Sequence, residues 1–201
     1  MREIPLASMR GHGPPPRVLA ACLLAGLAAW LSGCFTVDGT VKADGSATLA
    51  YTYTPVADAT EAGERARFVS PHVTVQSMTF AAGKPTVVKV AVDDVTKLGT
   101  ASAFKGVTIT RAKDGDEELL TIVIPNIDPR PLASVKGTYD DPKLGITVPG
   151  TVTKTEPTAP VTGSRVDWKI PLSHFYANHK AELTVRWKPE TAAPNTEPKK
   201  G

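Results

Sequence analysis

A short apolar run near the N-terminus decides which part of this chain can enter a folded domain. Residues 18–31 carry no charge, and Arg10 and Arg17 precede them. A basic segment followed by about 7–15 apolar residues is typical of a secretory signal peptide. A transmembrane helix needs about 20 apolar residues, so this run is too short to span a bilayer. The pattern therefore predicts export, with the first part of the chain removed.

The residues that end this run, Leu31-Ser32-Gly33-Cys34, resemble the lipobox of bacterial lipoproteins. The resemblance implies that the Cys34 thiol receives a diacylglyceryl group and that the chain is cut between Gly33 and Cys34. The new amino group can then be acylated, with palmitate as the expected label. Two or three acyl chains hold a protein to a bilayer, whereas one binds only marginally. The alternative is a buried helix at 18–31, with Cys34 an ordinary core thiol.

The residue after Cys34 bears on the destination of such a lipoprotein. In some bacteria with two membranes, an Asp at this position retains a lipoprotein in the inner membrane, but this chain has Phe35. By that analogy we expect the outer membrane in a host with two membranes, and the outer face of the cell membrane in other hosts. Translation can start at Met1 or at Met9, because the segment before the apolar run is long.

The chain that remains after cleavage is close to neutral. Removal of residues 1–33 leaves 168 of the 201 residues, which suits one domain with a sizeable core. The removed segment holds three of the 23 basic residues and one of the 20 acidic residues, so the net charge falls from +3 to about +1. Nucleic-acid binding requires clustered positive charge, so we expect no nucleic-acid partner.

The two cysteines predict no disulfide in the folded domain. Cys22 lies within the signal segment and leaves with it, and Cys34 is the expected acylation site. An exported chain with two cysteines would otherwise suggest a disulfide. The domain must therefore be stabilised by core packing alone.

Alternating apolar and polar residues predict about nine β-strands after Cys34. Asp44-Gly45 and residues 113–116 supply hairpin turns, because Asp-Gly tolerates the positive φ of tight turns. The expected strands are a hairpin within 35–54 and single strands at 73–80, 86–92, 106–112, 118–124, 132–139, 143–152, 165–172 and 181–187.

Helical signals are few and short. Residues 55–70 predict a helix that Asp58 or Thr60 can cap, and Asp93 or Asp94 can cap a second one that ends near residue 104. A helical turn is expected at 173–178, a proline-rich corner at 125–131 and a polar loop at 153–163.

These elements predict one α+β domain over residues 34–188. Its fold class is a largely antiparallel, curved sheet of about nine strands with one or two short helices. Residues 189–201 are rich in Pro, Thr, Lys and Glu without apolar periodicity, which predicts a disordered tail.

Two segments near the end of this domain resemble a known lipoprotein domain. Residues 145–152, Gly-Ile-Thr-Val-Pro-Gly-Thr-Val, are followed after a polar loop by residues 163–170, Gly-Ser-Arg-Val-Asp-Trp-Lys-Ile. This order is similar to the ending of LppM-type lipoprotein domains, which also begin with a lipobox and an Asp-Gly hairpin. The resemblance implies an anchored, non-catalytic α+β module, with lipid or glycolipid binding proposed for one member. Some relatives have a C-terminal transmembrane helix, which is not evident in this sequence.

The residue types that carry enzyme or metal chemistry do not form a recognisable motif. His174 and His179 are five apart, so a helix would not place them on one face, and His72 is distant. No carboxylate pair completes a zinc site, so we expect no metal and no cofactor. Residues 114–118 are acidic but lack the register of a calcium loop. Ser173 and His174 lack the glycines of a nucleophile elbow.

Four aromatic residues near the end of the domain are candidates for ligand contact. They can pack in the core, or they can line an apolar groove. These candidates are Trp168, Phe175, Tyr176 and Trp187.

The sequence therefore favours a membrane-anchored, non-catalytic binding or structural module, with a lipid, a glycolipid or an envelope protein as its partner. One alternative is a cell-envelope hydrolase, for which Asp93, Asp94, Asp140 and Asp141 are the available acids. Another is an accessory subunit of an envelope complex.

Overall fold

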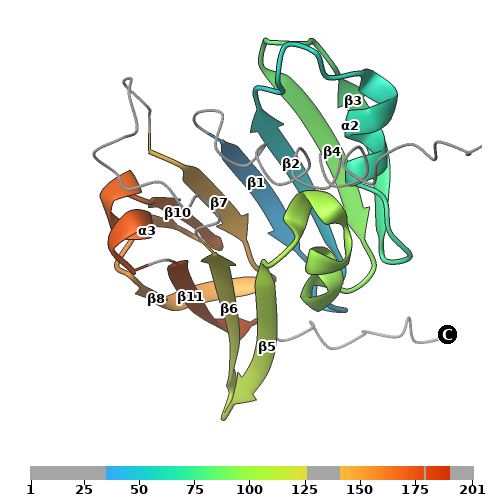
Figure 1. Cartoon of the computed structure of the whole chain (residues 1–201). Coiled ribbons are helices and arrows are strands. Elements are labelled where there is room, and N and C mark those ends of the chain that lie inside the picture. Colours follow the sequence, from blue (N-terminus) through green and yellow to red (C-terminus); the bar gives the residue numbers. More distant parts are fainter. Residues whose placement is uncertain (1–34, 126–140, 179, 191–201) are drawn as a thin grey trace, which may run out of the picture.

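Two packed β-sheets make up the fold (Figure 1). The computed structural model describes residues 35–125, 141–178 and 180–190. The seven-stranded sheet has the order β3 (Val73–Thr79), β4 (Thr86–Val92), β2 (Ala47–Tyr53), β1 (Thr36–Val41), β7 (Lys143–Thr147), β10 (Arg165–Lys169) and β9 (Val161–Thr162). The four-stranded sheet has the order β5 (Thr108–Asp114), β6 (Glu117–Pro125), β11 (Lys180–Pro189) and β8 (Gly150–Glu156).

The first hairpin forms because its turn residues suit a tight reversal of the chain. Gly45 has a φ of 87°, a conformation that residues with a side chain rarely adopt. Asp44 accepts hydrogen bonds from the hydroxyl and the backbone N–H of Ser46, at 2.8 and 2.9 Å. These bonds hold the pKa of Asp44 below its usual value, with the bond from the hydroxyl as the larger cause. The predicted hairpin within residues 35–54 is confirmed.

A parallel pairing joins the two halves of the seven-stranded sheet. Thr36 of β1 pairs with Lys143 of β7, and the register continues to Thr40 and Thr147. The other strand pairs of the described residues are antiparallel. Strand β1 is therefore bonded on both sides, to β2 and to β7, and lies in the interior of the sheet.

The chain crosses from one sheet to the other at Val148 and Pro149, where the sequence predicts one continuous strand over residues 143–152. This prediction is wrong, because β7 ends at Thr147 and β8 begins at Gly150 in the other sheet. Pro149 has no N–H to donate to a sheet ladder. The Gly150 N–H donates to Val148 O at 2.9 Å, which closes a tight corner.

The polar segment at 153–163 contains strand residues where a loop was expected. Strand β8 continues to Glu156, and Val161 and Thr162 form β9. Residues 153–156 are threonines and charged residues, so they lack the alternation of apolar and polar residues from which a strand is predicted.

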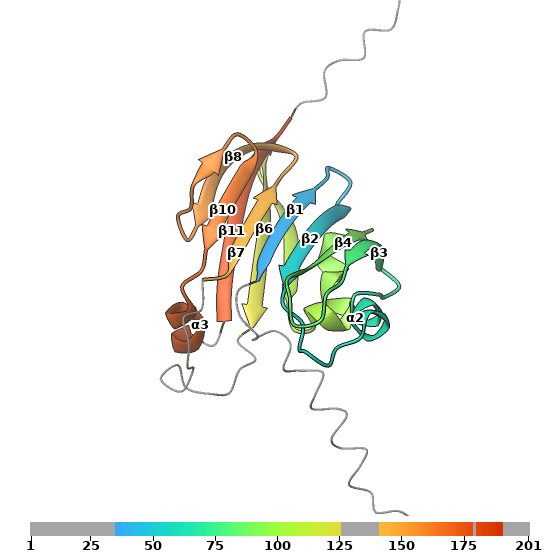
Figure 2. The ribbon, with the colours of Figure 1, turned by 90° about the horizontal axis from the view of Figure 1, so that it is seen from above.

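Short helices cover one part of the inner face of the seven-stranded sheet. They are α2 (Glu61–Arg67), η2 (Val95–Thr100) and η3 (Ser102–Phe104), where η denotes a 3₁₀-helix. The fourth helix, α3 (Leu172–Asn178), lies at the end of the two sheets and contacts β11 (Figure 2). Thr60 caps α2 by accepting the Gly63 N–H at 3.2 Å, and Asp94 caps η2 by accepting the Thr96 N–H at 2.9 Å. Both caps are among the predicted ones. The helix expected over 55–70 is shorter, because only residues 61–67 are helical.

Phe68, at the end of α2, and Phe104, in η3, pack against β2 through an aromatic cluster. The ring of Tyr51, on β2, lies 5.8 Å from the rings of Phe68 and Phe104, and Phe68 lies 5.5 Å from Phe104. The four-stranded sheet covers the remaining part of the inner face, over β1, β7 and β10 (Figure 2). The core is continuous across both regions.

The predicted α+β class with largely antiparallel strands is confirmed. The described residues form eleven strands, where about nine were expected, and the strands divide into two sheets. The strand predicted at 132–139 lies outside the described residues, as do residues 191–201 of the predicted tail. Strand β11 runs to Pro189, where that tail was expected to begin.

Arg111 joins the two sheets at the end that carries the first hairpin. It stands on the inner face of β5, where its guanidinium pairs with Glu118 of β6. The same guanidinium donates to Ala43 O, in the β1–β2 turn, at 3.0 Å. It also lies 5.8 Å from the ring centroid of Trp187, which is fully buried. One partly buried cation therefore bonds to both sheets.

We predict that Arg111→Ala lowers the free energy of unfolding by about 2 kcal/mol, because Glu118 and a carbonyl oxygen lose a charged donor in a partly buried site. Urea denaturation followed by circular dichroism measures this change. Lys113→Ala, two residues along the same strand and exposed, is the control and should change stability by less than about 0.5 kcal/mol. Equal effects of the two substitutions would contradict the role given to Arg111.

Candidate functional site

An apolar cavity lies between the two sheets. Its volume is about 50 Å³. Strands of both sheets and the helical segment that follows β4 contribute to its wall. The lining residues are Phe35, Val37, Val41, Leu49, Tyr51, Val95, Leu98, Phe104, Val107, Ile109, Leu120, Ile122, Ile124, Leu144 and Ile146.

A glycine on the inner face of β1 shapes this region. A Cβ atom at Gly39 would lie 2.7 Å from Leu49 Cδ2 and 2.9 Å from Ile146 Cδ1. Both distances are too short for a real contact, so the side chains of β2 and β7 occupy the space that a β1 side chain would need. Leu49 and Ile146 both line the cavity.

The chemistry of the cavity selects an apolar guest. No polar atom of its lining is exposed in it, so a water molecule would find no hydrogen-bond partner there. One water needs about 10–15 Å³ of such volume, and an apolar cavity of about 150 Å³ can hold benzene. The present space is therefore enough for a short piece of hydrocarbon, and a longer chain must displace lining side chains.

A second hollow, of about 290 Å³, lies on the outer face of the seven-stranded sheet. Arg165 crosses it and bonds to two carboxylates, Asp38 Oδ1 and Asp167 Oδ1, each at 2.8 Å. These bonds raise the pKa of Arg165, with the bond to Asp38 as the largest cause. Gly145 lies below the guanidinium, and a Cβ atom there would be 2.0 Å from Arg165 Nη2. Because residue 145 has no side chain, the guanidinium of Arg165 can lie directly over the backbone of β7.

The predicted acylation site lies outside the described residues. This applies to Cys34 and to the cleavage position after Gly33. Phe35, the first described residue, is buried and lines the cavity between the sheets. Lys143 donates its N–H to Phe35 O at 3.1 Å, which ties the start of the domain to β7.

Two of the four aromatic candidates are core residues. Trp168 on β10 is 3% exposed, and its indole N–H donates to Pro157 O at 3.0 Å. Trp187 on β11 is fully buried beside Arg111, and its indole N–H has no acceptor among the described residues. The backbone of Phe175 and Tyr176 belongs to α3, but their side chains lie outside the description. The structure therefore places Trp168 and Trp187 in the core.

The acidic candidates serve local structure on separate elements. Asp93 accepts from His72 Nδ1 at 3.1 Å at the surface, and Asp94 caps η2. Asp141 accepts the Leu172 N–H at 3.2 Å, at the start of α3. Asp140 lies outside the described residues.

The acids of the β5–β6 turn pair with basic side chains. Asp114 pairs with Arg186, and Asp116 lies 3.1 Å from Lys188. Among the described residues, no three side chains of the metal-ligating types cluster closely enough to hold an ion. His174 contacts Asn178 at the surface, and His179 lies outside the described residues.

No helix in the described part of the chain is long and apolar enough to cross a membrane.

Sequence reasoning did not single out the residues that shape either hollow. Gly39 and Gly145 interrupt otherwise regular strands, and a glycine inside a strand often marks a close approach of another group. That signal was present for both residues, although it does not say which group approaches.

Comparison with known proteins adds one structural likeness. No family model matches the chain, and no curated protein matches it. Among solved structures, the chain is similar to the folded domain of LppM from Mycobacterium tuberculosis, determined by NMR, at 17% sequence identity. The match covers 83% of this chain and 94% of that domain, with a TM-score of 0.45. The two sequence segments described above resemble domains of the same type.

Proposed function

We propose that this chain is an exported lipoprotein, anchored through an acylated Cys34, that binds an apolar chain between its two sheets. The apolar cavity carries the proposal, because its lining would hold hydrocarbon and would reject water. The lipobox supports the anchor. The expected guest is the acyl chain of a lipid or a glycolipid.

The position of Phe35 supports a connection between the anchor and the cavity. Phe35 directly follows Cys34 in the chain, and its side chain is one of those that line the cavity. One residue spans at most about 3.6 Å. The acyl chains of Cys34 would therefore begin near the apolar wall, and a membrane lipid could reach it over a short path.

A non-catalytic role fits the polar side chains better than hydrolysis does. Asp93, Asp94 and Asp141 each bind a local group, and they lie on separate elements. Tyr51 is the cavity residue with a titratable side chain, and no polar atom of the lining is exposed in the cavity. Binding of an apolar chain needs no acid, base or nucleophile.

We predict that the cell labels the wild-type protein with radioactive palmitate and that Cys34→Ala abolishes this labelling. The thiol is the acceptor for the lipid, and no other cysteine remains after cleavage. Labelling is measured on immunoprecipitated protein, with Ser32→Thr as a control that keeps the thiol. Equal labelling of wild type and Cys34→Ala would refute the anchor.

We also predict that Val107→Phe weakens the binding of a fluorescent fatty acid about ten-fold. Val107 is half-buried and lines the cavity, so a larger ring there displaces about two methylene groups of a guest, each worth about 0.8 kcal/mol. The measurement is a fluorescence titration of the acylated protein in phosphatidylcholine vesicles, with protein-free vesicles as the blank.

Val123→Phe is the matched control for this experiment. Val123 is also half-buried, but it stands on the other face of β6 and does not line the cavity. This variant should bind the fatty acid within a factor of two of the parent. Thermal denaturation shows whether both variants are folded. Saturable binding that Val107→Phe leaves unchanged would place the guest elsewhere.

A further inference from the structure

A row of polar side chains crosses the outer face of the seven-stranded sheet where β1 begins. Thr36 of β1 pairs with Lys143 of β7, and Lys143 pairs with Lys169 of β10. The three side chains belong to directly opposed residues of neighbouring strands. All three line the outer hollow of about 290 Å³.

The two lysines of this row lack a full set of counter-charges. Directly opposed like charges on neighbouring strands destabilise a sheet. Lys169 lies 3.4 Å from Asp141, which also accepts the Leu172 N–H. Among the described residues, no carboxylate lies within ion-pair distance of Lys143. The hollow is therefore positively charged at this end.

The carboxylates of the next row are already engaged. Asp38 and Asp167 lie two residues further along their strands, a distance of about 7 Å, and both bind Arg165. They carry one negative charge more than Arg165 neutralises. An anion at the lysines would thus stay at the outer end of the hollow, away from this row.

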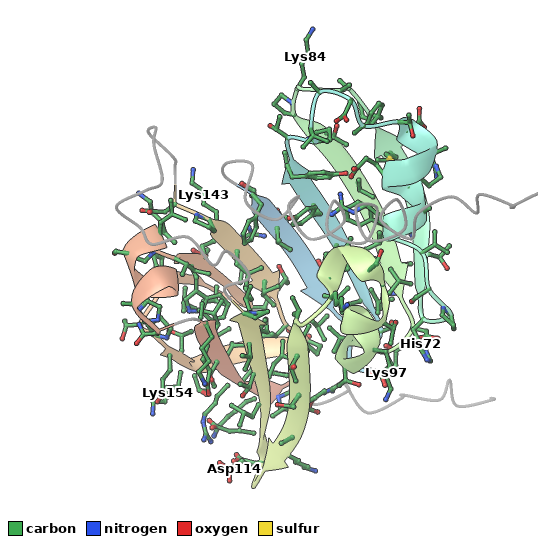
Figure 3. The ribbon with its side chains drawn as sticks, viewed as in Figure 1. His72, Lys84, Lys97, Asp114, Lys143 and Lys154 are labelled. Atoms are coloured by element: carbon green, nitrogen blue, oxygen red, sulfur yellow. The ribbon has the colours of Figure 1, made fainter. Side chains whose placement is uncertain are left out.

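The lysine row lies beside the proposed anchor. The N–H of Lys143 donates to Phe35 O at 3.1 Å, and Phe35 directly follows Cys34. Figure 2 shows that β1 and β7 begin at the end of the domain where α3 lies, opposite the β1–β2 hairpin. Lys143 projects from this end in Figure 3, whereas Asp114 and Lys97 lie far from it.

From this placement we propose that Lys143 and Lys169, with the Thr36 hydroxyl, bind the phosphate of an anionic phospholipid in the leaflet that holds the anchor. The proposal rests on the acylation of Cys34 proposed above. Two ammonium groups and a hydroxyl suit a phosphate group, and the anchor holds them at the depth of the headgroups. The contact would fix the orientation of the domain relative to the bilayer, with the lysine end of the outer sheet face at the headgroups.

The test uses the acylated protein in vesicles of phosphatidylcholine, with or without phosphatidylglycerol. A membrane-impermeant amine reagent labels the lysines, and mass spectrometry measures the labelling of each one. A lysine at an anionic surface gains about 1 kcal/mol, which corresponds to about a five-fold change in occupancy. Lys143 and Lys169 should therefore be labelled about five-fold less with phosphatidylglycerol present, and Lys97 and Lys113 equally in both.

A pair of variants with equal charge loss separates orientation from net charge. Lys180 begins β11 shortly after α3, so it lies at the same end of the domain, and phosphatidylglycerol should also protect it in the wild type. In Lys143→Gln with Lys169→Gln, Lys180 should lose this protection. In Lys97→Gln with Lys113→Gln, Lys180 should keep it. Protection of Lys180 that survives the first pair would show that these two lysines do not hold the headgroup.

The remaining outcomes separate the two proposals. If the protein does not float with the vesicles, the anchor fails and this inference fails with it. If the protein floats but Lys143 and Lys169 are labelled equally in both lipids, only the headgroup site is overturned. If inorganic phosphate protects both lysines equally well in phosphatidylcholine vesicles, the site takes a free anion and the assignment to a lipid is overturned.

Discussion

The pairing of β1 with β7 is the interaction on which the rest of the structure depends. It joins β3, β4 and β2 to β10 and β9 in one sheet, because β1 and β7 are the only neighbours that connect these groups in the described strand order. It also ties Phe35, next to the proposed anchor, to Lys143. The inner cavity and the outer lysine row therefore both lie near the point where the domain begins.

Two glycines give the opposite faces of this pairing their separate chemistry. Gly39 faces inward on β1, and the side chains of Leu49 and Ile146 fill its space. Gly145 faces outward on β7, and the guanidinium of Arg165 lies over it. The inner face thus stays apolar, while the outer face admits a charged group close to the backbone. An acyl chain and a phosphate would be held on different sides of the same two strands.

Local features of the fold could be predicted from the sequence, and long-range ones could not. Asp44-Gly45 and Gly115 mark hairpins because turn geometry depends on adjacent residues. The choice between two sheets depends on partners that are distant in the chain. Residues 143–152 have the alternating apolar pattern of one strand. In the structure, however, Gly150 lies against β11, and a Cβ atom at Gly150 would be 2.1 Å from the carbonyl oxygen of Lys188.

The candidate site shows the same limit. An alternating strand that contains a tryptophan is compatible with a groove and with a closed core, since both require one apolar face. Trp168 and Trp187 face the core, because each lies on the inner face of its own sheet and the other sheet covers that face. The cavity is lined by residues from 35 to 146, so no local segment indicates it. Only the lipobox could be read without knowledge of the fold, since it consists of adjacent residues.

The interior position of β1 has a consequence for synthesis of the protein. Thr36 needs Lys143 as its partner, and this pairing closes a loop of more than 100 residues. Such long-range contacts slow folding, because the loss of chain entropy comes before the contacts form. Until residue 147 has emerged from the ribosome or the translocase, one edge of β1 has no native partner and can pair with other strands. We expect the nascent chain to depend most on a chaperone during that interval.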